Sequence, residues 1–192
     1  MRANKSKRAD IRRELMAITM AVAAAGTTTA ATAALDIFIK LGDIKGESVD
    51  AKHKGEIDVL AWSWGLVGPS RNSPGVPQRP VGPAKDSCAQ SITVTKFVDV
   101  ASPLLMANAA LGTSLASAKL AVRRTEQPED FLVITMKDVL ISGISTGASG
   151  GEDAPTESLT LNFSSARVSF SPADQKGGVG EAVEADVPGT CP

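Results

Sequence analysis

The sequence predicts a mainly β domain, an antiparallel β-barrel of two packed sheets with one short α-helix. Three observations point to this class: apolar residues alternate with other residues from Leu35 onward, turn signals separate these runs, and two runs change register partway along. A register change of one residue indicates a β-bulge, and bulges bend strands toward barrel closure. The chain has 192 residues, 43% of them apolar, which is enough for one sizeable core.

Residues 1–33 are typical of an export signal and precede the predicted domain. They carry six Lys or Arg and two acidic residues, followed by an apolar stretch at 15–25 that is too short to cross about 30 Å of hydrocarbon. Small residues at 31–33 predict cleavage after Ala33, and Arg12-Arg13 is compatible with the twin-arginine route. A plain amphipathic helix and a misplaced start codon are the alternatives. With the leader removed, we expect a secreted protein without stable membrane insertion.

Two strands are expected next, at residues 35–41 and 57–65. The second strand has a bulky face with both tryptophans and a slim face that carries Val59, Ala61 and Ser63. Because aromatic side chains belong in the core, we expect the slim face to line a channel or meet a neighbour. Five prolines then predict a loop, which includes residues 69–83.

The remaining elements follow the same two patterns. Residues 92–97 predict a strand, and Ser102 as N-cap, Pro103 at the first helical position and Gly112 as the stop predict a helix. The apolar face expected for this helix consists of Leu104, Leu105, Ala107 and Leu111. Strands resume at 118–122, 132–141 and 159–170, with bulges near 137–138 and 164–165. The domain therefore covers 34–172, and residues 173–192 form a Gly-rich acidic tail, expected to be flexible with at most a weak edge strand.

Composition argues against several classes of function. Beyond residue 33 there are fourteen basic and nineteen acidic residues, so the domain lacks the basic surface that nucleic acid would need. One His and two Cys cannot build the usual zinc site, and we expect neither metal nor cofactor. Residues 143–147 match G-x-S-x-G, but no helix signal follows and the only histidine, His53, comes earlier than this serine. We therefore expect no enzymatic activity.

Cys88 and Cys191 form a candidate disulfide. In an oxidising compartment the bond would tie the tail to the barrel, and closing a loop of this length would stabilise the fold by about 4 to 5 kcal/mol in the entropic model. A cross-link between protomers and two free thiols are the alternatives, since spacing alone does not establish proximity.

Several segments resemble the Hcp family, the haemolysin-coregulated tube proteins of type VI secretion systems. They include LDIFIKLGDIKGESVDAKHKGEIDVLAWSWG at 35–65, TKFVDVASPLLMANA at 95–109, AKLAVRR at 118–124, FLVITMKDVLISGISTGASGGED at 131–153 and TESLTLNF at 156–163. The resemblance implies an Hcp-like barrel that forms homo-hexameric rings, which stack into a tube with effector proteins in its lumen. Secretion-system tip and sheath components would be further partners.

The resemblance also assigns roles to residues. Ser63 lies at a lumen-facing position of the family, on the slim face with Ala61 and Val59. The loop at 43–56 corresponds to the family's loop that reaches a neighbouring protomer; a merely solvated turn is the alternative. Its charged residues are Lys45, Glu47, Asp50, Lys52, His53, Lys54 and Glu56.

Two departures from the family pattern leave alternatives open. No aromatic closing segment follows Pro172, and tube proteins that assemble in the cytoplasm carry no export signal. We expect a tube-forming structural protein, with two alternatives: exported rings or fibres independent of the contractile machine, or a monomeric secreted binding module that uses the loop at 69–83. The alternative route to the outside is cytoplasmic assembly followed by type VI secretion.

Overall fold

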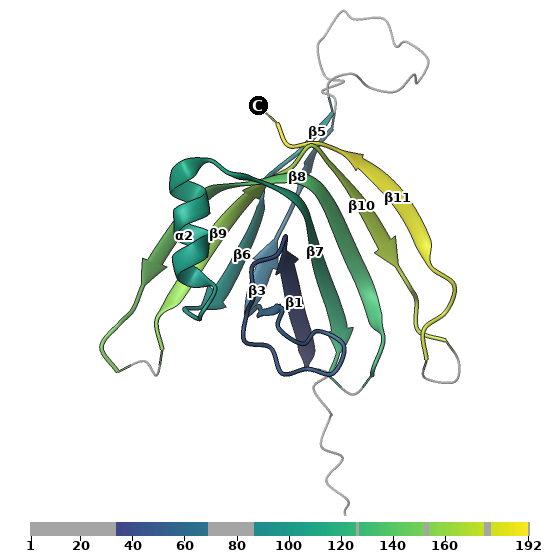
Figure 1. Ribbon diagram of the computed structural model, residues 1–192. Helices are drawn as coiled ribbons and strands as arrows, with labels where there is room; N and C mark the ends of the chain where they lie inside the picture. The colour runs from purple at the N-terminus through teal and green to yellow at the C-terminus, as the bar shows by residue number, and fades with distance from the viewer. Residues whose placement is uncertain (1–33, 69–86, 126, 152–153, 175–177, 192) are drawn as a thin grey trace, which may run out of the picture. The chain divides into compact units, whose positions relative to one another are not determined.

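Antiparallel strands make up most of the computed structural model, which describes residues 34–68, 87–125, 127–151, 154–174 and 178–191 (Figure 1). The expected export signal at 1–33 and the Pro-rich loop at 69–83 lie outside these residues. The strands are β1 (Leu35–Leu41), β2 (Ile57–Asp58), β3 (Ala61–Ser63), β4 (Leu66–Val67), β5 (Cys88–Ala89), β6 (Ile92–Phe97), β7 (Ser114–Arg124), β8 (Asp130–Gly147), β9 (Thr156–Asn162), β10 (Ser165–Phe170) and β11 (Val183–Pro188), and the helix is α2 (Ser102–Leu111).

One large sheet contains nine of the strands in the order β2-β1-β7-β8-β9-β6-β3, with β10 paired to β8 and β11 to β10. The first half of β8 pairs with β10 and the second half with β9, so this 18-residue strand joins two parts of the sheet. The ladder does not close, because β2 and β3 pair with β1 and β6 and not with each other. They are nevertheless consecutive in the chain, which brings the two ends of the sheet together. The predicted antiparallel, mainly β class with one helix is confirmed.

Alternating apolar residues supply the core, as the strand pattern predicts. Ile39, Leu120, Ile134 and Leu159 are fully buried, and they come from four strands of the large sheet. The bulge expected near 137–138 is present as a change of face: Met136 and Val139 are buried while the two residues between them are exposed. Asp138 has a φ of 49° and lies where β8 changes its partner from β10 to β9.

The helix α2 packs on β8 and begins one residue earlier than predicted, with Ala101 as its N-cap. Ser102 instead turns its side chain into the protein, where its Oγ donates to Glu157 Oε1 at 2.7 Å. Gly112 ends the helix as predicted, in the left-handed conformation that favours glycine. The predicted apolar face is wrong, because among its four members only Leu105 is buried.

The predicted strand at 57–65 is not continuous, since the structure divides it into β2 and β3 with Val59 and Leu60 between them. Val59 N donates to Ile37 O at 2.9 Å and Leu60 N donates to Thr95 O at 2.8 Å, so the chain changes partner strand at this point. The alternation slips by one residue there, and Ile57 and Val59 face the core on one side of the break while Trp62 packs against it on the other. Val59 therefore does not belong to the exposed slim face.

The C-terminal residues are also more ordered than the expected flexible tail at 173–192. The strand β11 pairs with β10 over six residues, from Phe170 opposite Val183 to Ser165 opposite Pro188. At most a weak edge strand was expected there, but β11 is a regular edge strand. It forms because β10 pairs with β8 on one edge only, which leaves its other edge for β11.

Candidate self-association surface

The strand β3 presents small side chains outward and large ones inward. Ala61 and Ser63 are exposed, whereas Trp62 and Trp64 pack against the core. The Trp64 ring meets Phe163 edge to face at 5.9 Å, and its Nε1 donates to Gln90 O at 3.0 Å. Two of the three residues predicted on the slim face therefore share one exposed surface, and the tryptophans fix its orientation.

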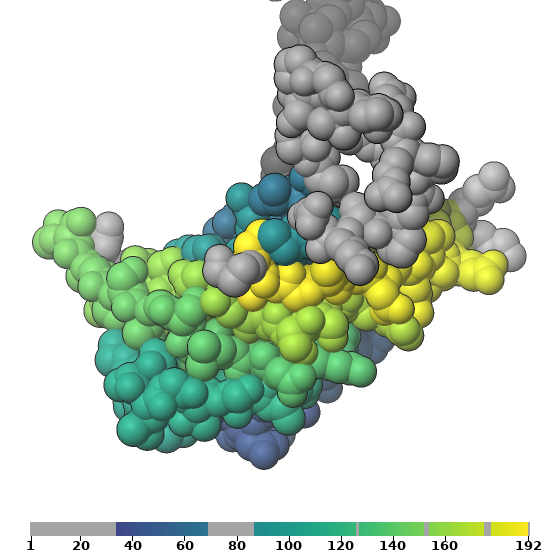
Figure 2. Space-filling view, turned by 90° about the horizontal axis from the view of Figure 1, so that it is seen from above, coloured from purple at the N-terminus to yellow at the C-terminus, as the bar shows by residue number. Residues whose placement is uncertain are grey.

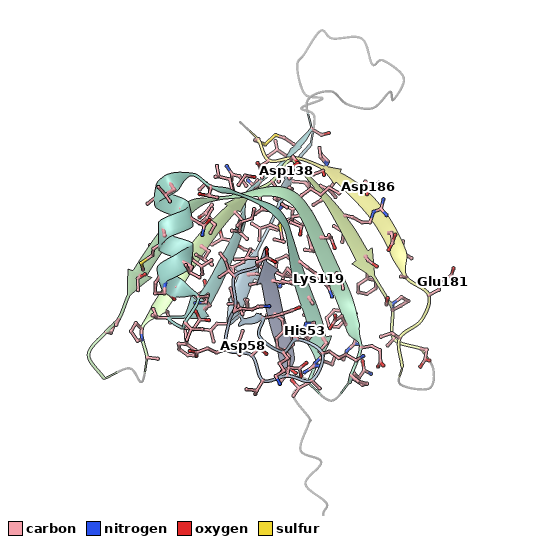
Figure 3. All side chains as sticks on the ribbon, in the orientation of Figure 1. His53, Asp58, Lys119, Asp138, Glu181 and Asp186 are labelled. Carbon is pink, nitrogen blue, oxygen red and sulfur yellow. A yellow bond between two sulfur atoms is a disulfide. The ribbon has the colours of Figure 1, made fainter. Side chains whose placement is uncertain are left out.

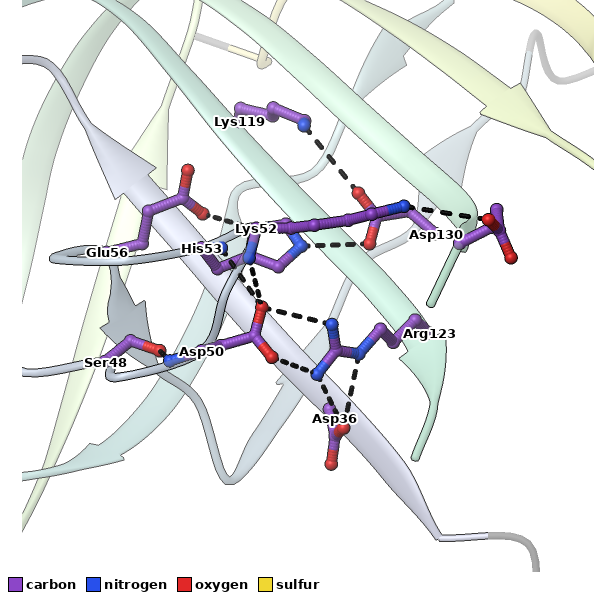
Figure 4. Close-up of polar contacts among 10 residues, drawn as sticks. Asp36, Ser48, Asp50, Lys52, His53, Glu56, Lys119, Arg123 and Asp130 are labelled. Atoms are coloured by element: carbon purple, nitrogen blue, oxygen red, sulfur yellow. Dashed lines mark hydrogen bonds and ion pairs between the residues drawn. The ribbon is translucent and has the colours of Figure 1, made fainter. Parts of the chain in front are cut away.

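The loop at 43–56 folds back on itself and lies against β1, β7 and β8. Gly46 N donates to Gly55 O at 2.9 Å, and Ser48 N donates to Glu56 O at 3.0 Å, which closes the loop with a short antiparallel pairing. The side chains that turn toward the strands then meet charged partners there (Figure 4).

Arg123 on β7 binds two carboxylates, one from β1 and one from the loop. Its guanidinium donates to Asp36 Oδ2 at 3.1 Å and makes two hydrogen bonds to the carboxylate of Asp50. These hydrogen bonds, with backbone donors from Lys52 and His53, hold the pKa of the Asp50 carboxyl well below its usual range. Asp50 also raises the pKa of Arg123 by the reciprocal bond. The ion pair attaches the loop to the sheet.

His53 is buried in the same network, only 2% exposed. Its Nδ1 lies 2.8 Å from Glu56 Oε2 and its Nε2 lies 3.0 Å from Asp130 Oδ1 on β8. The imidazole stacks on the Phe38 ring at 4.2 Å between centroids, and the Arg123 guanidinium lies 5.1 Å from the same ring. Phe38 is an aromatic residue on the otherwise polar face of β1, and this is the signal in the sequence that points to the cluster.

The loop residues named from the resemblance divide into two groups. Asp50 and His53 bind strands of their own chain, and Glu56 binds His53. His53 is buried, so its side chain does not lie on the exposed rim that was expected between protomers. The other four charged residues are exposed: Lys45, Glu47, Lys52 and Lys54. Lys52 Nζ lies 3.7 Å from Glu129 Oε1, an exposed pair that contributes little stability.

The outer face of α2 is apolar and carries no charged residue. Leu104 is 54% exposed, Met106 41% and Leu111 80%, and Val100 just before the helix is 60% exposed. A group of large apolar side chains in contact with solvent is typical of a surface that another protein covers. Beside it, a groove of about 560 Å³ runs between α2, the start of β7 and the turn after β1.

Cys88 and Cys191 form a disulfide, with a Cα–Cα distance of 5.0 Å. In Figure 3 the sulfur–sulfur bond lies at the top, at the other end of the strands from His53. Glu181 and Asp186 lie on the β11 side of the molecule, also away from His53 (Figure 3).

Other chemistry expected or excluded from the sequence can be located among the described residues. Ser145 of the G-x-S-x-G match lies inside β8, opposite Ser158, and not at the strand-to-helix turn that a nucleophile needs. No group of three His, Cys, Asp or Glu residues in the described part of the chain is arranged to hold a metal ion. None of the helices described there has the length and apolar character to cross a membrane.

Comparison with known proteins agrees with this architecture. The family described as type VI secretion system effector, Hcp, matches residues 38–170. Protein hcp1 of Pseudomonas aeruginosa is 43% identical over 146 residues, which cover 75% of this chain and 88% of that protein. The crystal structure of Hcp1 from Salmonella typhimurium is 30% identical with a TM-score of 0.66, over 81% of this chain and 95% of that one.

A type VI secretion system effector from Yersinia pestis is similar as well, with 29% identity and a TM-score of 0.61 over 79% of this chain and 100% of that one. The family match at 38–170 runs from β1 to the end of β10, and the TM-scores show a shared fold. This chain belongs to the Hcp family of type VI secretion proteins.

Proposed function

We propose that the chain is a non-enzymatic structural subunit that assembles into homo-hexameric rings, and that the rings stack into a tube in a type VI secretion-like system. Membership of the Hcp family carries this proposal. The exposed face of β3 supports it, because small side chains backed by anchored tryptophans suit the wall of a narrow channel.

In this assembly Ala61 and Ser63 face the lumen. A wall of small side chains binds cargo by shape and by weak hydrogen bonds, so that an effector protein held there can also be released. Secretion-system tip and sheath components are the other proposed partners. The reaction chemistry of an enzyme is not required for any of these roles.

Neighbouring protomers meet through two surfaces of different character. A ring needs a heterologous contact, in which one surface of a copy fits another surface of the next copy. The apolar outer face of α2 supplies hydrophobic surface that is buried on association, and the exposed charges of the loop supply a polar rim. Lys45, Glu47 and Lys54 are exposed members of this rim, and Glu47 Oε1 also accepts a hydrogen bond from Val100 N at 3.3 Å.

Size-exclusion chromatography with light scattering and negative-stain microscopy tests the assembly. We expect annular particles of six subunits, and a Leu111→Glu variant, altered at a side chain that is 80% exposed, should shift the population toward monomers. Val183→Glu is the matched control: it changes a valine that is 70% exposed on the edge strand β11 and should leave the rings intact. Monomers alone at high protein concentration would contradict the proposal.

An exported form of the protein is a second candidate, and the disulfide favours it. Disulfides persist in oxidising compartments, so the Cys88–Cys191 bond agrees with a signal that directs the chain out of the cytoplasm and is cleaved after Ala33. Rings or fibres would then form outside the contractile machine. N-terminal sequencing of the secreted protein distinguishes the routes: a start at Ala34 supports export by the leader, and an intact Met1 supports cytoplasmic assembly and type VI secretion.

A further inference from the structure

The C-terminal strand β11 is held on the sheet by few contacts of its own. Five of its six residues are exposed, and only Val187 packs against the core. Its ion pairs both come from Arg167, which makes two hydrogen bonds to Asp186, at 2.8 and 3.2 Å, and lies 3.7 Å from Glu184 Oε2; all three side chains are more than half exposed. Exposed pairs of this kind contribute little stability, so the ladder to β10 and the attachment at the end of the strand decide whether β11 stays in place.

That attachment combines the disulfide with backbone hydrogen bonds, which include Thr190 N to Phe163 O at 2.9 Å. After β11, Gly189 crosses so close to β9 and β10 that an added Cβ would come within 2.5 Å of Ser164 O. Ala89 N donates to Gly189 O at 2.9 Å, and Cys191 N donates to Ala89 O at 2.8 Å. The Cys88–Cys191 bond makes this short bridge to β5 covalent. In the space-filling view, the yellow C-terminal residues lie along the yellow-green surface of β10 (Figure 2).

The neighbouring strand β10 is held in the sheet by contacts that do not involve β11. β10 pairs with β8 along all six residues, Ala166 is buried in the core, and Val168 packs against it. Loss of β11 would therefore leave β10 in the sheet and expose one edge of it.

We propose that the Cys88–Cys191 disulfide is a redox-operated latch: when oxidised it holds β11 on the edge of β10, and its reduction releases β11 without unfolding the rest of the sheet. Reduction requires a cellular dithiol. One thiolate of the dithiol attacks a sulfur of the bond, and its second thiolate resolves the mixed disulfide. Two electrons and two protons pass to Cys88 and Cys191, which become thiols, and the dithiol becomes a disulfide. Both cysteine residues are half-buried rather than enclosed.

The latch makes one surface of the protein depend on its compartment. In oxidising surroundings β11 covers the edge of β10; in a reducing cytoplasm the backbone N–H and C=O groups of residues 165–170 that face β11 become available for pairing with another strand. This inference goes beyond the proposed function, because it concerns a single subunit and holds whether or not rings form.

Hydrogen–deuterium exchange of the full chain, oxidised and in excess dithiothreitol, tests the latch. On reduction, exchange in residues 183–188 and in the residues of 165–170 that pair with β11 should accelerate at least about tenfold more than exchange in residues 118–122 of β7, which follows the stability of the whole sheet. The double variant Cys88→Ser/Cys191→Ser should show the reduced pattern with or without dithiothreitol.

Two outcomes overturn the proposal. If β11 stays equally protected after reduction, the disulfide does not hold it; if all strands lose protection by the same factor, the bond supports the whole fold and is no latch. Should the double variant fail to fold, reduction of the folded wild-type protein still decides between these outcomes.

Discussion

At the level of single residues, the loop at 43–56 is attached by charges that find partners far away in the chain. Asp50 and Arg123 are 73 residues apart, and His53 and Asp130 are 77 apart. Asp50 binds Arg123 of β7 and His53 binds Asp130 of β8, so the loop is attached to two strands and no single ion pair holds it alone.

The substitution Asp50→Asn should destabilise the protein in a way that depends on pH. Arg123 keeps the pKa of Asp50 below its usual range in the folded state, so the carboxylate stabilises the fold fully above the ordinary carboxyl pKa of about 3.9. This stabilisation is lost as the pH falls below that value toward the folded pKa. Urea unfolding at pH 7, 5 and 3 should show a difference between wild type and variant that shrinks at pH 3. Asp58→Asn, at an exposed position, is the control.

A second residue-level prediction concerns the buried pair beneath the start of α2. Lys96 is fully buried, and its Nζ donates to Glu157 Oε1 at 2.6 Å and to Asp99 Oδ1 at 2.8 Å. Lys96→Met leaves the Glu157 charge buried without its partner, which should cost about 3 to 5 kcal/mol in unfolding free energy by denaturant titration. The double variant Lys96→Met/Glu157→Leu should recover most of that loss. A double variant no more stable than Lys96→Met would contradict this account.

Among the elements, α2 depends on one leucine for its docking. Leu105 is fully buried, whereas Leu104 beside it is 54% exposed. The helix therefore has apolar residues both on the side that packs on the core and on the side that faces solvent. Leu105 contacts the core, and the outer leucines remain available to another molecule.

Adjacent leucines therefore give a matched pair for measurement. Leu105→Ala should lower the unfolding free energy by about 2 to 5 kcal/mol because it leaves a cavity in the core. Leu104→Ala should change it by no more than about 0.5 kcal/mol, since the side chain is largely in solvent. Both values come from urea unfolding of the full chain; equal losses for the two variants would show that the helix docks differently.

For the molecule as a whole, the disulfide restricts the unfolded chain over most of the domain. It joins residues 103 apart, and in the entropic model a loop of this length contributes about 4.7 kcal/mol. Reduction should therefore lower the unfolding free energy by about that amount. Residual structure in the unfolded chain makes the effect smaller, because such a chain has less entropy to lose. Urea unfolding with and without dithiothreitol measures it, and the double serine variant, insensitive to the reductant, serves as the control. A change below about 1 kcal/mol would contradict the entropic account.

Much of the fold follows from local sequence. The strands at 35–41 and 92–97 have the predicted bounds, because alternation of apolar residues over six or seven positions leaves little choice of face. The end of α2 at Gly112 and the change of face at 137–138 were predictable for the same reason: each depends on a few neighbouring residues. The class of fold and the Hcp resemblance were thus accessible from the sequence, and both are confirmed.

The tertiary structure decided the features that depend on distant partners. Val59 turns into the core because the chain changes from β1 to β6 beside it, and His53 is buried because Asp130 and Phe38 meet it from other strands. The pairing of Cys88 with Cys191 required the C-terminus to return to β5, 103 residues earlier in the chain. The local sequence determines which face of a strand is apolar; which strand lies beside it is set by packing of the whole chain.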